Sequence, residues 1–362
     1  MSEKQVDQTS VVAETSVTSM TQNNLDFCRF WLAIQVIFSH SFALAEGDEC
    51  REPLSILTSG QLNSGEFAVG CFFAISGFLI THSWLRSRSA SSFLSKRVRR
   101  IYPGFVAAVL FGVFIVAPIG AAYIKWTARD ILSLPLNLIA LRNVEPKGVF
   151  PHNPCPGLIN GSLWSIPYEF KCYLVVMLIG GLGLFRDRRL VLGILIAILA
   201  GGFFYRPDST SVVERGAFAV IIGKVSFWCN VLPYFIAGMA YYLYRDQIPR
   251  SRQFLAIVSL ILVISAVVPP AGRVAFPLAI TFLLFWFAFH SPFRIYGWSR
   301  YGDFSYGIYL YAFPLQQLMV MRFPGISPVL LFLVSTPLAV IAGVISWHLL
   351  EKHFLKRATH AA

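Results

Sequence analysis

Long apolar runs recur along the whole chain, and they constrain its fold more than any other feature. A helix that crosses a bilayer needs roughly 20 apolar residues. About ten segments approach this length, near residues 25–45, 66–84, 101–124, 163–184, 190–205, 227–244, 254–270, 274–290, 304–322 and 328–350. Charged residues make up only 13% of the chain, compared with roughly a quarter in soluble domains. The sequence therefore predicts an all-α integral membrane protein with about ten transmembrane helices.

The formal net charge of +12 raises the question of a nucleic-acid partner. A nucleic-acid-binding protein gathers its charge on one soluble face, whereas here the Lys and Arg residues fall in short loops between apolar runs. If the N-terminus is cytosolic, the inside loops hold roughly twice as many Lys and Arg residues as the outside loops, which is the bias that orients membrane proteins. The pattern predicts two cytosolic termini, an even number of spans and no nucleic-acid partner.

The domain organisation follows from the same pattern. Residues 1–22 are polar, rich in Ser, Thr and Gln, and lack the apolar core of a signal peptide. We predict a disordered cytosolic tail over 1–22, a single membrane domain over 23–355 and a short cytosolic tail over 356–362.

Two of the six cysteines, Cys50 and Cys155, fall in loops that the charge bias places outside. Disulfides persist where that side is oxidising, so a Cys50–Cys155 bridge and two free thiols are both open. Neither a CxxC pair nor a His/Cys cluster with metal-ligand spacing occurs in the sequence, so no metal cofactor is expected.

The first apolar segment, LDFCRFWLAIQVIFSHSFAL, carries Arg29 and His40. Ionisable groups in a membrane helix are costly and usually face the bundle interior or a water-filled cavity. The step between the two residues is about three helical turns, which puts them on one face and roughly 16 Å apart. Two other interpretations remain open: Arg29 extends to the inner lipid surface, or His40 is a hydrogen-bonded interfacial histidine. We predict that both residues line a functional site.

The first inside loop ends in SKRVRRIYPG, a basic cluster at 95–104. Such clusters often serve as topology signals or bind anionic lipid headgroups. Arg97 and Arg100 are three residues apart and share a face if the segment is helical. The functional interpretation is an anion site for a phosphorylated donor.

The fourth segment opens with NGSLWSIPYEFKCYLVV at 160–176, where Gly161 and Pro167 interrupt regular helix. Irregular backbone at membrane depth is tolerated where it lines a cavity. Glu169 beside a histidine would orient it or raise its basicity, and the alternative is an interfacial glutamate paired with Lys171. Elsewhere, Ser76 and Gly77 favour close helix packing, and the tyrosines and glutamines of 303–317 suggest either a polar lining or an interfacial belt.

Six motifs follow one another over residues 22–355: LDFCRFWLAIQVIFSH, FFAISGFLI, FLSKRVRRIYP, NGSLWSIPYEF, YGIYLYAFPLQQ and SWHLLEKHFLK. In this order they resemble the acyltransferase-3 family of membrane acyltransferases, which includes bacterial exopolysaccharide, lipopolysaccharide and Nod-factor O-acetyltransferases. The resemblance implies a ten-span enzyme of the bacterial inner membrane. It implies transfer of an acyl group, usually acetyl, from cytosolic acyl-CoA to a sugar hydroxyl of a cell-surface or exported polysaccharide or glycolipid.

The resemblance also assigns roles to individual residues. His40 matches the catalytic histidine, Arg29 the arginine of the same motif, and Arg97 and Arg100 the pair associated with the CoA donor. Glu169 matches the acidic residue of the SLW element, and we count it with His40 as a catalytic residue. One departure is Tyr311, which stands where many members have His, and it receives no catalytic role.

On this interpretation acyl-CoA docks its phosphates on Arg97 and Arg100, and its thioester reaches along Arg29 towards His40, which acts as a base or carries the acyl group. Glu169 orients His40 or holds the acceptor. The alternative class is a transporter or flippase for a lipid-linked glycan, although the inverted repeats of many transporters are not evident. A scaffold within polysaccharide assembly machinery is the third interpretation.

Overall fold

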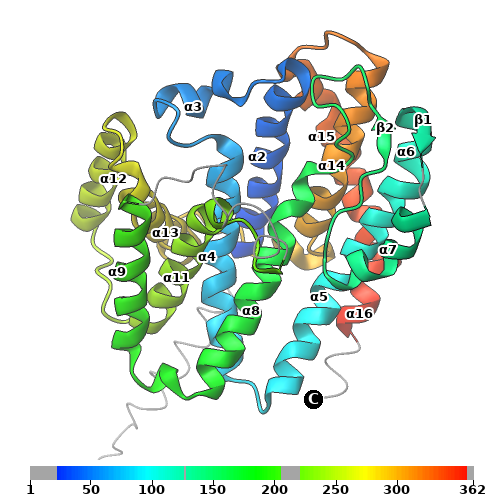
Figure 1. The fold of residues 1–362 in the computed structure, drawn as a ribbon. Coiled ribbons are helices and arrows are strands. Elements are labelled where there is room, and N and C mark those ends of the chain that lie inside the picture. The colour runs from blue at the N-terminus through cyan, green and yellow to red at the C-terminus, as the bar shows by residue number, and fades with distance from the viewer. Residues whose placement is uncertain (1–22, 126–127, 205–220, 357–362) are drawn as a thin grey trace, which may run out of the picture.

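The computed structural model describes residues 23–125, 128–204 and 221–356, and it is a bundle of helices (Figure 1). The predicted tail at 1–22 and most of the predicted tail at 356–362 lie outside the described residues. Ten long helices overlap the ten predicted segments, one each, although the third helix shares only residues 101–111 with the segment predicted over 101–124. They are α2 (Leu25–Glu46), α4 (Ser64–Leu85), α5 (Ala90–Phe111), α8 (Ile166–Gly181), α9 (Arg188–Phe204), α11 (Val225–Tyr244), α12 (Arg252–Val267), α13 (Gly272–His290), α14 (Ser305–Arg322) and α15 (Pro328–Ser346).

In the described part of the chain, 6 helical stretches are long and apolar enough to cross a membrane. They are Leu25–Glu46, Ser64–Leu85, Ala90–Gly120, Gly161–Gly181, Gly272–His290 and Pro328–Leu355. Exposed Leu, Ile, Val and Phe side chains cover the outward faces of several helices, α12 and α15 among them. Such a surface suits lipid, because apolar patches of this extent are rare on soluble proteins.

Helix α2 lies at the centre of the bundle, where it packs against α4, α14 and α15 (Figure 1). A second close contact joins α4 to α11. A Cβ atom added at Gly77 would lie 1.9 Å from the carbonyl oxygen of Phe235, and one at Gly238 would lie 2.0 Å from that of Ala74. The predicted packing role of Gly77 is therefore confirmed, since only glycine lets these two backbones approach so closely.

The connections at the two ends of the bundle differ. At one end lie the α4–α5 and α8–α9 turns and the short C-terminal α16 (Lys352–Lys356), drawn at the bottom of Figure 1. At the other end lie α3 (Pro53–Leu57) and the segment between α5 and α8. That segment holds α6 (Ala117–Gly120), α7 (Ala128–Ile139) and an antiparallel pair of strands, β1 (Ala121–Lys125) and β2 (Lys147–Val149).

Three local expectations are resolved by the structure. The basic segment is helical from Ala90 onward, so it belongs to α5 instead of forming a loop between the predicted segments 66–84 and 101–124. A short 3-10 helix, Gly161–Ser165, precedes α8, and Pro167 lies in the first turn of α8, which confirms the predicted irregular backbone. Cys50 and Cys155 are free thiols, so the structure does not contain the disulfide weighed from the sequence.

Candidate active site

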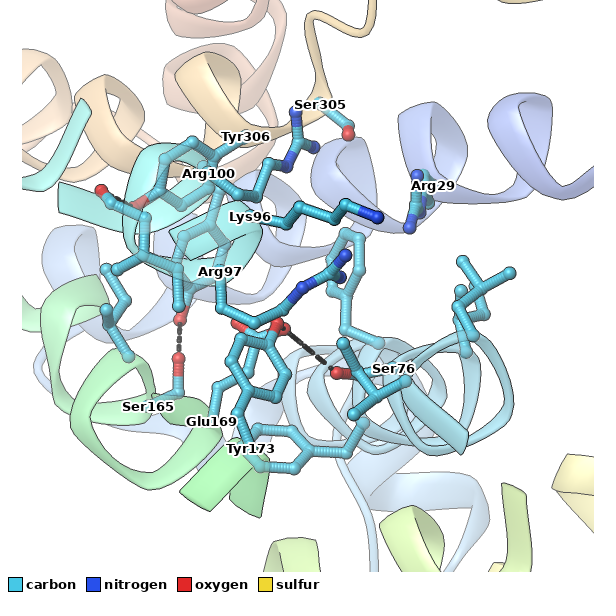
Figure 2. Close-up of a pocket in the computed structure, with 18 of the residues that line it drawn as sticks. Arg29, Ser76, Lys96, Arg97, Arg100, Ser165, Glu169, Tyr173, Ser305 and Tyr306 are labelled. Carbon is cyan, nitrogen blue, oxygen red and sulfur yellow. Dashed lines mark hydrogen bonds between the residues drawn. The ribbon is translucent and has the colours of Figure 1, made fainter. Parts of the chain in front are cut away.

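A cavity of about 320 Å³ lies between α2, α4, α5, α8 and α14. Its polar lining includes Arg29, Ser76, Lys96, Arg97, Arg99, Arg100, Ser165, Glu169, Tyr173, Ser305, Tyr306 and Tyr309, and we call it the arginine cavity. Figure 2 shows the ends of Lys96 and Arg97 pointing towards Arg29, with Ser76, Glu169 and Tyr173 on the opposite side. The structure thus brings together four of the five predicted site residues, Arg29, Arg97, Arg100 and Glu169.

Asp303, just before α14, holds two of the arginines in place. Its Oδ2 lies 2.5 Å from Arg100 Nη2 and 3.4 Å from Arg29 Nη1, and its Oδ1 accepts a hydrogen bond from Ser305. Burial raises the pKa of the Asp303 carboxyl. The guanidinium groups of Arg100 and Arg29 together have the larger, opposite effect, so the net result is a pKa below the usual value. Asp303 therefore remains ionised and joins Arg29 and Arg100 in a partly buried ion cluster.

Glu169 belongs to a second polar cluster on the far wall of the arginine cavity. Its Oε1 accepts hydrogen bonds from Tyr173, at 2.5 Å, and from Ser76, at 3.1 Å. The guanidinium of Arg97 lies over the Tyr173 ring, 6.0 Å from its centroid, and donates to Ser83 at 3.4 Å. The Nε of Arg97 is buried and has no hydrogen-bond partner among the described residues. Arg97 thus retains an unused donor inside the cavity.

The charges around this cavity do not balance. Five cations line it, and Glu169 is the only carboxylate among its described lining residues. Asp303 adds a negative charge behind Arg29 and Arg100, and Asp26 adds one 3.8 Å from Arg29. In the described part of the chain, no carboxylate forms an ion pair with Lys96, Arg97 or Arg99. Because buried cations are costly unless paired, this arrangement favours binding of a group with several negative charges.

His40 lies in a different, larger cavity of about 560 Å³, which we call the histidine cavity. Its lining includes Ser39, His40, Glu49, Asn63, Glu66, Val69, Trp164, Phe227, Tyr234, Arg273 and Tyr309. The His40 ring packs edge-on against Phe313, 5.0 Å between centroids, and its Nδ1 is buried without a hydrogen-bond partner among the described residues. An imidazole with a free ring nitrogen beside a cavity can accept a proton or form a bond to a carbonyl carbon.

The predicted contact between Glu169 and His40 is absent. Glu169 faces the arginine cavity and is held by Ser76 and Tyr173, whereas His40 faces the histidine cavity. Glu169 does not pair with Lys171 either, because the Lys171 ammonium donates to the carbonyl of Ile222 at 2.9 Å. Any functional role of Glu169 must therefore involve a molecule bound in the arginine cavity and not His40.

The two cavities share two lining residues, Val69 of α4 and Tyr309 of α14. The Tyr309 hydroxyl lies 2.7 Å from Ser165 Oγ and donates to the carbonyl of Ser162 at 2.6 Å. The dashed line at Ser165 in Figure 2 follows the first of these contacts. Arg29 and His40 both belong to α2, and they thus lie on opposite sides of the boundary formed by Val69 and Tyr309.

Comparison with known proteins identifies the family of this chain. A family model described as an acyltransferase domain, Acyl_transf_3, matches residues 22–348. The chain belongs to the acyltransferase-3 family. The resemblance drawn from the motifs is confirmed, and the protein is an acyltransferase of this family with several apolar helices that fit a membrane.

Two curated relatives align along almost the whole chain. The chain is 27% identical over 359 residues to an "O-acetyl transferase" of Shigella phage Sf6, covering 93% of this chain and 97% of the relative. It is 25% identical over 360 residues to "Nodulation protein 10" of Rhizobium leguminosarum bv. viciae, covering 93% of this chain and 94% of the relative. No solved structure matches the chain significantly.

Other residues of this family member take structural roles. Gln316 donates to the carbonyl of Ile37 and to Ser41, which ties α14 to α2. Gln317 donates to the carbonyls of Cys155 and Leu158, which ties α14 to the segment before α8. Tyr311 packs edge-on against Phe111 and lines neither cavity. The two glutamines are therefore helix-to-helix links, and the polar lining from α14 consists of Ser305, Tyr306 and Tyr309.

Sequence reasoning missed Asp303 and misjudged Ser76. Asp303 opens the DFSYGIYLYAF stretch and is separated from Arg29 by 274 positions, so no local pattern links them. The sequence feature that could have pointed to Asp303 is an acidic residue directly before a predicted helix that carries several tyrosines. Ser76 was assigned to packing together with Gly77, but only Gly77 faces α11, while Ser76 bonds Glu169. In the described residues, no group of three or more His, Cys, Asp or Glu could hold a metal ion.

Proposed function

We propose that this acyltransferase moves an acyl group, most simply acetyl, from cytosolic acyl-CoA to a sugar hydroxyl of a cell-surface or exported polysaccharide or glycolipid. The observation that carries the proposal is the pair of adjoining cavities, one rich in arginine and one lined by His40. The family match and the relative named O-acetyl transferase support the acyl chemistry.

The arginine cavity suits the donor. Coenzyme A carries several phosphate charges, and arginine guanidinium groups bind phosphate through two parallel hydrogen bonds. Arg97 has an unused buried donor, and the cations of this cavity outnumber its carboxylates. We assign Arg97 and Arg100 to the donor phosphates and Arg29 to the part of the donor nearer the thioester. Glu169 then positions the donor through Ser76 and Tyr173.

The histidine cavity suits the acceptor, and two routes of transfer fit His40. In the first, His40 removes the proton of the acceptor hydroxyl, whose oxygen attacks the thioester carbonyl carbon; the carbon–sulfur bond breaks and the coenzyme A thiolate takes up a proton. In the second, an imidazole nitrogen attacks the thioester and releases the thiol, and the hydroxyl then displaces the acyl group from the imidazole. Both routes yield the same ester and free coenzyme A.

We further propose ten spans, two cytosolic termini and residence in the bacterial inner membrane. The α4–α5 turn, the α8–α9 turn and α16 share one end of the bundle, which fits the charge bias of the loops (Figure 1). Cys50 is exposed beyond the far end of α2. In intact spheroplasts a membrane-impermeant maleimide should label Cys50, the one cysteine classed as exposed among the described residues, and labelling should fall once Cys50 is replaced by Ser. Labelling that appears only after permeabilisation would contradict this orientation.

A carrier for a lipid-linked glycan is not favoured. The family model and the relative named O-acetyl transferase both indicate group transfer, and the catalytic interpretation uses the unpartnered nitrogen of His40, for which a carrier has no need.

The decisive experiment follows radiolabelled acetyl from acetyl-CoA to glycan in membrane vesicles. We expect His40→Ala to abolish transfer and Arg29→Ala to reduce it strongly at unchanged membrane levels. His152→Ala, at an exposed histidine between β2 and α8, serves as the matched control and should retain full transfer. Full acetylation by His40→Ala with loss of glycan export would refute the proposal. Label retained on the wild-type protein without acceptor, and absent from His40→Ala, would select the second route.

A further inference from the structure

The boundary between the two cavities has a consequence for the choice of acyl group. Arg29, Arg97 and Arg100, assigned to the donor, line only the arginine cavity, and His40 lines only the histidine cavity. A thioester held by the arginines must therefore present its acyl carbon to His40 across the residues common to both cavities. Those residues are Val69 and Tyr309.

We infer that Val69 and Tyr309 form a passage for the acyl group, and that the space between their side chains selects short acyl groups over longer ones. The inference rests on the proposed function, because it requires an acyl-CoA donor in the arginine cavity. It adds a specificity-determining pair to the residues that bind the donor and carry out the transfer.

The structure makes this boundary rigid. Tyr309 is 8% exposed and Val69 is 7% exposed, so both side chains are packed. The Tyr309 hydroxyl is fixed by Ser165 and by the carbonyl of Ser162, both in the 3-10 helix before α8. Phe72 packs edge-on against the Tyr309 ring, 6.2 Å between centroids. A tyrosine held at its hydroxyl and at its ring cannot easily swing aside for a long chain.

The opposite wall of the passage is equally confined. Val69 lies on α4, one turn before Phe73, and α4 itself is held by the close contact of Gly77 with the Phe235 carbonyl of α11. Because α4 cannot shift away without breaking that contact, the size of the side chain at position 69 sets the width of the passage. A pocket that is one methylene too small discriminates by roughly 10- to 200-fold.

The test compares acetyl-CoA with butyryl-CoA as donors for the full-length protein in vesicles. We expect Val69→Ala and Tyr309→Leu to raise the ratio of kcat/KM for butyryl-CoA to that for acetyl-CoA by roughly tenfold. Val69→Leu narrows the passage and should lower acetyl transfer. Val176→Ala removes the same atoms from a fully buried valine of α8 that lines neither cavity, and it should leave the ratio unchanged.

The outcomes separate this inference from the function on which it rests. An unchanged ratio in Val69→Ala or in Tyr309→Leu, with acetyl transfer retained, overturns the passage and leaves the proposed function standing. A rise of equal size in Val176→Ala also overturns it, because general loosening would then explain the effect. A wild-type protein that transfers neither acyl group overturns both.

Discussion

Replacing Asp303 by Asn tests whether one carboxylate organises the donor site. Asp303 is 14% exposed and lies 2.5 Å from Arg100 and 3.4 Å from Arg29. Removing one partner of a buried ion pair costs about 3–5 kcal/mol, because the remaining charge stays buried and unpaired. Asparagine keeps one oxygen, which can accept from Arg100 or from Ser305 because these two bond different oxygens of Asp303. We therefore expect the lower end, about 3 kcal/mol of unfolding free energy.

The same replacement should change the response to the donor. Without Asp303, Arg100 has no ion-pair partner among the described residues and Arg29 retains only Asp26 at 3.8 Å, so both should interact more strongly with a phosphate of coenzyme A. A ligand present at a hundred times its Kd stabilises the native state by about 2.7 kcal/mol, and a tenfold change in Kd alters this stabilisation by about 1.4 kcal/mol. Wild type and variant are therefore compared at one fixed concentration of coenzyme A. Because Arg29 loses the shorter of its two ion pairs, we also expect kcat for acetyl transfer to fall in Asp303→Asn.

The measurement is unfolding of the purified protein by SDS in mixed micelles, with and without coenzyme A, together with acetyl-transfer kinetics in vesicles. Asp26→Asn is the matched control. Asp26 also pairs with Arg29, but at 3.8 Å and with a side chain 43% exposed, so its loss should cost less than about 1 kcal/mol. Equal costs for the two variants, or an Asp303→Asn protein as stable and as active as wild type, would refute the reasoning.

Three further predictions follow from the same geometry. Arg97→Ala should raise KM for acetyl-CoA about 10- to 100-fold, the value of a charged hydrogen bond, whereas Arg86→Ala, exposed outside the cavity, should leave KM unchanged in the same assay. Glu169→Gln removes the one carboxylate among the described lining residues of the arginine cavity, so repulsion of the anionic donor should fall. Transfer kinetics should show a lower KM for acetyl-CoA and a lower kcat. A higher KM at unchanged kcat would contradict the positioning role of Glu169. Gly77→Ala should cost about 3 kcal/mol or more in SDS unfolding because its Cβ would meet a backbone carbonyl, while Gly193→Ala, with open space around it, should be neutral or stabilising by up to about 1 kcal/mol.

The helices and the residues that face the bundle interior could be predicted from local pattern alone. Apolar runs of membrane length mark α2, α4 and α15, and a costly charge inside such a run marks Arg29 as an interior residue. The basic cluster likewise predicted an anion site, although its helix begins at Ala90, well before the apolar run predicted over 101–124. Each of these inferences depends on residues within a few turns of one another.

The sequence by itself determined the membrane helices, the irregular start of α8 and the family, because composition, helical periodicity and motif order are local or sequential properties. Only the tertiary structure decided that Asp303 binds Arg29 and Arg100, that Glu169 faces the arginines instead of His40, and that Val69 and Tyr309 separate the two cavities. These relations join positions far apart in the chain. They depend on how far each helix is rotated and how closely its neighbours approach, which side-chain packing sets and sequence spacing does not.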